Sequence, residues 1–170
     1  MKLHGDITIN GRKYQKGDTL PWYFVYPFFL LHMGGFGASG FFMAYADGPG
    51  VFFLYVHGGF ACLLYVVFYL AIFGVDRVRW MFINAGLGLF GIYAQIDLIL
   101  SWFGKKASDY SAVVHAIPFF YYVLYTFLIH QMLIDLTRSR EDPGRRRLID
   151  ALYIVVSLLV YGYLWTLGAR

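Results

Sequence analysis

The chain has 170 residues, of which 59% are hydrophobic and 14% are charged, and its mean hydropathy is +0.58. Soluble domains average about 45–50% apolar and about 25% charged residues, so this composition excludes an ordinary soluble protein and indicates an integral membrane protein. The formal net charge of +4 is interpreted as membrane topology rather than nucleic-acid binding, because basic residues of membrane proteins gather on the cytoplasmic side. The single cysteine, Cys62, excludes an internal disulfide, a cysteine-ligated iron–sulfur cluster and a covalently attached haem.

Residues 1–21 are polar and contain no apolar core, so they are expected to form a cytoplasmic N-terminal arm rather than a signal peptide. Within this arm, Ile7-Thr8-Ile9 is followed by the turn pair Asn10-Gly11 and then by Lys13-Tyr14. An Asn-Gly pair between two short strand-forming segments is typical of a β-hairpin. We therefore expect a small hairpin that lies against the membrane surface.

Five hydrophobic segments follow, and each is long enough to cross about 30 Å of hydrocarbon as an α-helix. The expected spans are Trp22–Tyr45, Val51–Phe73, Val78–Phe103, Tyr110–Leu136 and Leu148–Leu167. A tight turn at Asp47-Gly48-Pro49-Gly50 is expected between the first two. The predicted fold is thus an all-α integral membrane protein, with four helices over residues 22–136, a basic loop over 137–147 and a fifth helix within 148–170.

The distribution of basic residues predicts the orientation of the chain in the membrane. With the N-terminus inside, the inner side holds 11 of the 14 Lys and Arg residues, whereas the outer side holds only Lys105, Lys106 and Arg170. The positive-inside rule therefore predicts a cytoplasmic N-terminus and an external C-terminus. The expected location is a bacterial inner membrane, with the lipid bilayer as surroundings and no nucleic-acid partner.

Ionisable side chains within membrane spans are functional candidates by default. The candidates here are His32, His57, Asp97, His115 and His130. His115 and His130 are 15 positions apart on one predicted helix, which is about 22 Å along its axis, and both lean toward broadly the same face. By depth, His57 matches His115 near the outer surface, and His32 is the available partner for His130 near the inner surface. The sequence therefore predicts two histidine pairs stacked through the membrane.

Paired neutral imidazoles from facing helices are the axial ligands that low-spin b-type haems require. Glycines follow two of these histidines, and small residues let a helix backbone approach a flat ligand or another helix closely. The predicted residues for two b haems, with the histidines as ligands of the iron, are therefore His32, His57, His115, His130, Gly35 and Gly58.

This placement resembles the diheme membrane cytochrome b family of nickel–iron hydrogenases and formate dehydrogenases, which also includes a small stand-alone superoxide oxidase. The family carries one ligand histidine on helix 1, one on helix 2 and two on helix 4; the matching segments are Leu31-His32-Met33, Val56-His57-Gly58-Gly59, and Val114-His115 to Ile129-His130. The resemblance covers about residues 22–136, and the chain departs from it in the H-x14-H spacing of helix 4 and in its fifth helix. It implies electron transfer between a quinone and either a partner subunit of a larger oxidoreductase, a periplasmic electron carrier or a small oxidant such as superoxide.

Asp97 is the predicted catalytic residue, because a carboxylate buried beside the outer haem suits proton exchange during such chemistry. An equally weighted alternative is that Asp97 pairs with Lys105 or Lys106, or bonds to a neighbouring polar side chain. The quinone pocket is not specified by any motif, and the residues at a suitable depth are Tyr23, Arg79 and Asn84.

Two other interpretations stay open. In the first, the histidines only hydrogen-bond to neighbouring helices, and the protein is a small non-catalytic membrane protein such as an immunity or assembly factor. In the second, His57, Asp97 and His115 lie at similar depth and bind iron, copper or zinc without porphyrin.

Overall fold

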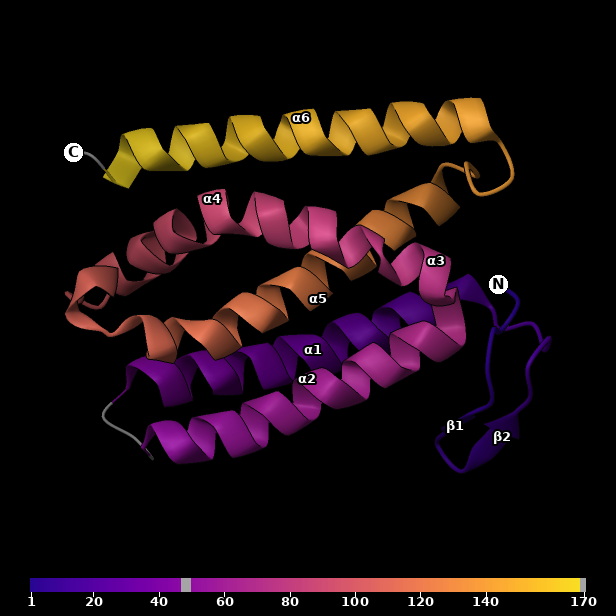
Figure 1. Ribbon diagram of the computed structural model, residues 1–170, viewed down its shortest axis with the longest axis horizontal. Coiled ribbons are helices and arrows are strands. Elements are labelled where there is room, and N and C mark those ends of the chain that lie inside the picture. Colours follow the sequence, from indigo (N-terminus) through magenta and orange to yellow (C-terminus); the bar gives the residue numbers. More distant parts are fainter. Residues whose placement is uncertain (47–49, 169–170) are drawn as a thin grey trace.

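The computed structural model describes residues 1–46 and 50–168, so most of the predicted turn Asp47-Gly48-Pro49-Gly50 lies outside the described residues. Two short strands, β1 (Ile7–Ile9) and β2 (Arg12–Tyr14), precede the helices. The helical elements in Figure 1 are α1 (Trp22–Tyr45), α2 (Val51–Phe73), α3 (Val75–Val78), α4 (Trp80–Ser101), the 3-10 turn η1 (Ala107–Asp109), α5 (Ala112–Leu136) and α6 (Pro143–Gly168).

Within residues 1–46 and 50–168, five helical segments are long and apolar enough to cross a membrane, which confirms the predicted number of spans. α1 and α2 have the predicted bounds, and the third span is divided at Arg79 into α3 and α4. α6 begins at Pro143 rather than at the predicted Leu148. The reason is local: Asp142 accepts hydrogen bonds from the backbone N–H groups of Gly144 and Arg145 (3.0 Å each), and proline suits the first helical position. The predicted loop over 137–147 is therefore shortened to 137–142.

The predicted hairpin is confirmed, and it is attached to the bundle. β1 and β2 pair in antiparallel register. Both turn residues, Asn10 (φ 49°) and Gly11 (φ 76°), adopt the left-handed conformation that a two-residue turn of this kind requires. The Ala71 carbonyl near the end of α2 accepts hydrogen bonds from the backbone N–H groups of His4 (2.7 Å) and Gly5 (3.0 Å). The arm therefore covers one end of the helices.

The central helix of the bundle is α5, which packs against α1, α2 and α4. α6 lies beside α4 at the edge of the bundle and contacts α5 less (Figure 1). Two glycines permit the closest approaches between helices. A methyl group added at Gly58 would lie 2.4 Å from Ile117 of α5, and one added at Gly91 would lie 2.4 Å from Tyr161 of α6. Small residues at helix contacts are typical of packing in membranes.

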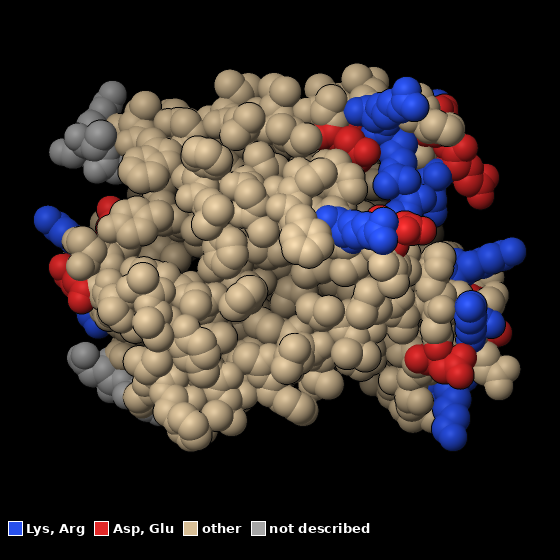
Figure 2. All heavy atoms as spheres, in the orientation of Figure 1, with Lys and Arg blue, Asp and Glu red and all other residues tan. Residues whose placement is uncertain are grey.

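Charged side chains gather at the two ends of the bundle and leave the middle apolar (Figure 2). Most of the Lys and Arg residues lie at the end formed by the N-terminal arm, α3 and the loop between α5 and α6, which we call the basic end. The opposite end contains η1. An apolar belt between two polar ends is the distribution expected of a protein that spans a bilayer.

Candidate functional site

His115 and His57, the predicted outer pair, have partners other than each other. The Tyr45 hydroxyl donates to Nδ1 of His115 (2.7 Å), and Nε2–H of His115 donates to the carbonyl of Ala107 (3.2 Å). Both ring nitrogens of His115 are therefore used within the protein. His57 stacks parallel to Phe53 of its own helix, with 6.0 Å between the ring centroids.

The predicted inner pair, His32 and His130, also has two separate environments. His32 of α1 is exposed, and its Nδ1–H donates to the Phe28 carbonyl one turn earlier (2.8 Å). His130 of α5 is 0% exposed, and its Nε2–H donates to Oδ1 of Asp150 on α6 (2.8 Å). The His130 ring stacks on Trp80 of α4, with 4.0 Å between the centroids. The buried ring thus faces α4 and α6.

The other predicted site residues have contacts that explain their positions structurally. Asp97 accepts a hydrogen bond from the backbone N–H of Ala107 (2.8 Å) and so attaches η1 to α4. Gly58 brings α2 against Ile117 of α5, whereas Gly35 has open space beside it. Gly58 therefore serves the close packing of α2 against α5.

As packed in this structure, the four predicted histidine ligands do not form facing pairs. A haem with two histidine ligands needs imidazoles that face each other across a planar cavity, whereas α2 and α5 are in direct contact beside Gly58. Aromatic side chains fill the interior of the bundle, and the largest fully buried ones are Tyr26, Phe29, Tyr69, Phe73 and Phe127. Haem binding stays a prediction.

The predicted metal and quinone sites are not assembled either. Within the described residues, no group of three or more His, Cys, Asp and Glu side chains is placed to hold a metal ion, and this includes the set His57, Asp97 and His115. Of the three residues predicted at a membrane depth suitable for a quinone pocket, Asn84 is buried, whereas Tyr23 and Arg79 are exposed. None of the three lines any of the cavities described below.

The largest of these cavities, about 1100 Å³, opens at the basic end. The N-terminal arm, the junction of α2 and α3, and the segment from the end of α5 to the start of α6 surround it. Five basic and three acidic side chains line it, so its charge is net positive: Lys2, Arg77, Arg138, Arg140 and Arg146, with Asp76, Asp135 and Glu141. The other two cavities, of about 240 and 110 Å³, lie among mostly apolar residues.

Three of the cavity arginines have a buried N–H group that finds no hydrogen-bond partner among the described residues: Nη1 of Arg77, Nη2 of Arg140 and Nε of Arg146. The charges of Arg140 and Arg146 lie near enough to act on Arg77. An unpaired buried donor costs about 1–3 kcal/mol, and a charged one costs more. An anion bound among the three guanidinium groups would supply the missing acceptors and offset their mutual repulsion.

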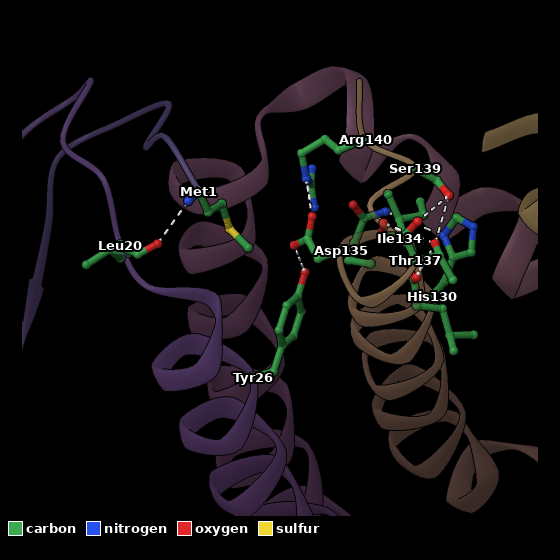
Figure 3. Close-up of polar contacts among 11 residues, drawn as sticks. Met1, Leu20, Tyr26, His130, Ile134, Asp135, Thr137, Ser139 and Arg140 are labelled. Carbon is green, nitrogen blue, oxygen red and sulfur yellow. Dashed lines mark hydrogen bonds and ion pairs between the residues drawn. The ribbon is translucent and has the colours of Figure 1, made fainter. Parts of the chain in front are cut away.

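One wall of this cavity is fixed by a chain of polar contacts that joins α1, α5 and the following loop (Figure 3). The Tyr26 hydroxyl donates to Oδ2 of Asp135 (2.5 Å), and the other carboxylate oxygen accepts Nε–H of Arg140. Burial lowers the pKa of Arg140, but the contact with Asp135 outweighs burial and raises it above the ordinary value. Arg140 is therefore held as a cation, with Nη2 left for a ligand.

α5 ends in a left-handed turn that carries another cavity arginine. Arg138 has φ 53°. The turn is closed by hydrogen bonds from the Ser139 N–H to the Ile134 carbonyl (2.9 Å) and from the Arg138 N–H to the Asp135 carbonyl (3.1 Å), an arrangement in which glycine is favoured. A non-glycine residue in this conformation costs about 1–2 kcal/mol. Such strained residues concentrate at functional sites.

Two carboxylates of this region, Asp135 and Asp150, are absent from the predicted site residues, although both lie within predicted spans. A carboxylate in a span is itself a functional signal, and the four-residue spacing of Arg146 and Asp150 indicates an ion pair on one helix face. Nε of Arg146 lies 3.8 Å from Oδ2 of Asp150. Because Asp150 also accepts from His130, it joins the buried histidine to a cavity arginine.

Comparison of the chain with protein-family models, curated proteins and solved structures gave no match. The candidate site is therefore defined by its own chemistry. It is a net positive cavity at one end of the helix bundle, with arginine donors that have no hydrogen-bond acceptor in the described part of the chain. The arrangement is suited to holding an anion.

Proposed function

We propose that this protein binds a phosphate-bearing anion in the cavity of its basic end. Its five apolar helices indicate a multi-pass membrane protein in a lipid bilayer. By the positive-inside rule, the basic end faces the cytoplasm, as in a bacterial inner membrane. The ligand is therefore taken from the cytoplasm or from the cytoplasmic leaflet.

The observation that carries this proposal is the set of three buried, unpartnered arginine N–H groups around one cavity. A phosphate group offers several acceptor oxygens, and the planar guanidinium fork matches them in pairs. A purely topological role requires only that arginines lie on the correct side of the membrane. Exposed residues such as Arg79 and Arg147 meet that requirement without desolvation. The half-buried position of Arg77 and Arg146 is better explained by a ligand.

Two sources can supply this chemistry: the phosphodiester headgroup of an anionic phospholipid, and a soluble phosphate compound. Trp22, at the start of α1, lines the cavity, and tryptophan concentrates at the level of the lipid headgroups. The volume of about 1100 Å³ is at the upper end of ligand pockets, which span about 300–1,000 Å³. The cavity therefore has room for a headgroup or for a free ligand of similar size.

Calorimetry on the protein in phosphatidylcholine nanodiscs tests the proposal. The ligands are short-chain phosphatidylglycerol, short-chain phosphatidylcholine and glycerophosphoglycerol, which is the free headgroup. We expect Arg77→Gln to weaken binding of the phosphatidylglycerol about tenfold, the effect of losing one charge-assisted hydrogen bond. Arg79→Gln is the matched control, because Arg79 is exposed and lies outside the cavity lining.

The outcomes of this experiment separate the two sources. Free headgroup that binds as tightly as the lipid assigns a soluble ligand, whereas binding of the lipid alone assigns a membrane ligand. Equal effects of Arg77→Gln and Arg79→Gln would point to general attraction between a basic surface and anions. That result, or no preference for phosphatidylglycerol over phosphatidylcholine, would overturn the proposal.

We propose, as a second candidate function suggested by the histidine placement, electron transfer between a quinone and an external partner with two b haems as cofactors. It is favoured by the packing of α5, which carries His115 and His130, on both α1 and α2, which carry His32 and His57. It requires all four rings to leave their present surroundings. A dithionite-reduced minus oxidised spectrum of protein from haem-replete cells decides it. Two b haems per chain would support electron transfer, and the absence of a haem band would reject it.

A further inference from the structure

The cavity of the basic end presents three buried hydrogen-bond donors, and each comes from a different arginine. Nη1 of Arg77, Nη2 of Arg140 and Nε of Arg146 have no acceptor among the described residues. All three side chains line the same cavity, and Arg140 and Arg146 lie near enough for their charges to act on Arg77. The three donors therefore belong to one cluster, in which Arg77 is close to both of the others.

Two of these arginines are held at the cavity wall by carboxylates. Nε–H of Arg140 donates to Oδ1 of Asp135, whose other oxygen accepts from the Tyr26 hydroxyl. Nε of Arg146 lies 3.8 Å from Oδ2 of Asp150, which is close enough for an ion pair but too far for a hydrogen bond. The contacts position both guanidinium groups and leave one donor of each free. Donors that are already positioned lose little side-chain freedom when they bind a ligand.

The backbone donors at the start of α6 are used within the protein. A helix N-terminus commonly binds anions through its free N–H groups. Here the Asp142 side chain accepts from the N–H groups of Gly144 and Arg145 (3.0 Å each), and Pro143 has no N–H. The groups that recognise an anion in this cavity are therefore the arginine side chains.

The number of free donors distinguishes two classes of phosphate compound. A phosphate monoester has three terminal oxygens, all strong acceptors, and carries close to two negative charges at neutral pH. In a phosphodiester one of these oxygens is bonded to a second organic group, which leaves two terminal oxygens and one charge. Three donors from three side chains can each meet a separate oxygen of a monoester. A diester leaves one donor without a terminal oxygen of its own.

The charge of the cavity favours the same class. Five basic and three acidic side chains line it, which leaves an excess of two positive charges. Within the described residues, Arg77 forms no ion pair. The attraction between the arginine cluster and a ligand increases with the charge of the ligand. A dianion therefore offsets the repulsion among the three guanidinium groups better than a monoanion does.

We propose that the anion of this cavity is a phosphate monoester, with its terminal oxygens bound by Arg77, Arg140 and Arg146. This inference rests on the proposed function and names the class of its ligand. The monoester is either the headgroup of a lipid of the phosphatidic acid type or a soluble phosphate compound. Phosphodiesters such as phosphatidylglycerol bind the same cavity more weakly.

Calorimetry at pH 8 on the protein in phosphatidylcholine nanodiscs compares matched ligands. Short-chain phosphatidic acid and short-chain phosphatidylmethanol differ by one methyl group on the phosphate, and glycerol 3-phosphate and glycerophosphoglycerol form the soluble pair. We expect the monoester of a pair to bind about tenfold more tightly than the diester, the effect of one additional charge-assisted hydrogen bond. Binding of the lipid pair alone assigns a membrane ligand, whereas glycerol 3-phosphate that binds as tightly as phosphatidic acid assigns a soluble one.

The preference for the monoester is expected to depend on pH. A phosphate monoester takes up a proton with a pKa of about 6 and becomes singly charged. The ratio of the monoester and diester affinities should therefore fall from about tenfold at pH 8 toward equality at pH 5. The groups of the protein that face the ligand are His4 of the arm and the eight charged side chains named for this cavity. Their titration acts on both ligands, and the diester, whose own charge is constant, measures it.

Arg77→Gln and Arg79→Gln form a matched pair for this experiment. The first removes a guanidinium group from the cluster, and the second removes one from an exposed position outside the cavity lining. We expect Arg77→Gln to reduce the preference for the monoester to about threefold or less, because two buried arginine donors then face three oxygens. Arg79→Gln should keep the preference of the wild type.

Phosphorus-31 resonances of the monoester bound to the wild type test the inference if Arg77→Gln does not fold. A cluster of cations favours the doubly charged form of the ligand. The resonance of bound glycerol 3-phosphate or phosphatidic acid is therefore expected to titrate at a lower pH than that of the same compound free in buffer or in protein-free nanodiscs. Titration at the same pH in both would contradict the inference.

The other results that would overturn the inference differ from those that reject the proposed function. Equal affinity for the monoester and the diester at pH 8 leaves an anion site but assigns it no preference for monoesters. An equal loss of preference in Arg77→Gln and Arg79→Gln would assign the preference to general surface charge. No binding of any of the four phosphate compounds rejects the proposed function itself, together with the inference that depends on it.

Discussion

Polar side chains make different kinds of contact at the two ends of the bundle. At the end that contains η1, Lys105 donates to the Tyr45 carbonyl (2.8 Å), and Asp97 and His115 both bind backbone groups of Ala107. The one hydrogen bond between side chains in this group is that from the Tyr45 hydroxyl to His115. At the basic end, polar side chains bind one another. Asp135 contacts Tyr26 and Arg140 (Figure 3), and Asp150 accepts a hydrogen bond from His130.

This difference indicates which end is available for a ligand. The bonds of Asp97 and His115 to Ala107 hold the connection between α4 and α5 in place, so the contacts at the end with η1 are structural. Contacts among side chains at the basic end still leave donors of Arg77, Arg140 and Arg146 without acceptors. Hydrogen-bond donors that lack acceptors beside a cavity indicate a binding site, because a ligand in the cavity would supply the acceptors.

The prediction with the largest expected effect compares the contributions of half-buried and exposed arginines to anion binding. The double variant Arg77→Gln/Arg146→Gln is expected to weaken phosphatidylglycerol binding about a hundredfold, since two charge-assisted hydrogen bonds are lost. The control Arg79→Gln/Arg147→Gln removes the same total charge from exposed positions. Calorimetry measures the affinity of both double variants. A similar loss of affinity in the two would contradict the difference between cavity and surface arginines.

A smaller effect compares one carboxylate from each end. Asp135→Asn is expected to lower the free energy of unfolding by about 1–3 kcal/mol, less than for a fully buried ion pair because Arg140 keeps partial access to solvent. Asp97→Asn should cost less, about 1 kcal/mol, because the amide oxygen still accepts from the Ala107 N–H. Equilibrium unfolding in mixed micelles measures both variants. A greater loss for Asp97→Asn would reverse the assignment of the two ends.

The smallest effect concerns the strained arginine. Arg138→Gly is expected to stabilise the protein by about 1 kcal/mol, because glycine adopts φ 53° without strain. The same change should weaken anion binding about threefold through the loss of one exposed charge. Asn10→Gly is the control, since Asn10 also has a positive φ (49°) but lies in the hairpin turn. Thermal unfolding and calorimetry together check the pair; unchanged anion binding by Arg138→Gly would remove Arg138 from the site.

Much of the fold follows from the sequence because its signals are local. The bounds of α1 and α2 and the hairpin turn at Asn10-Gly11 could be predicted, since apolar runs and an Asn-Gly pair act within a few residues. The predicted start of α6, Leu148, lies after its observed start, Pro143. The reason is that the arginines after the Asp142 cap do not belong to the apolar run from which the span is predicted.

The partners of the candidate residues could not be predicted in the same way. Depth along a helix indicated that His130 would meet His32, but the rotation of α5 turns His130 toward Trp80 and Asp150 instead. The positive charge of the basic end was evident from composition, whereas the cavity and its unpartnered arginine donors were not.

The sequence by itself therefore determined that this is a five-span membrane protein with one basic end and a small hairpin. The tertiary structure decided which polar groups meet: His130 with Asp150, Asp135 with Arg140, and Arg77 and Arg146 around one cavity. The physical reason is that spans are selected by the transfer of each segment into hydrocarbon, a property of that segment alone. Side-chain partners depend on how helices rotate and pack against one another, which depends on all of them together.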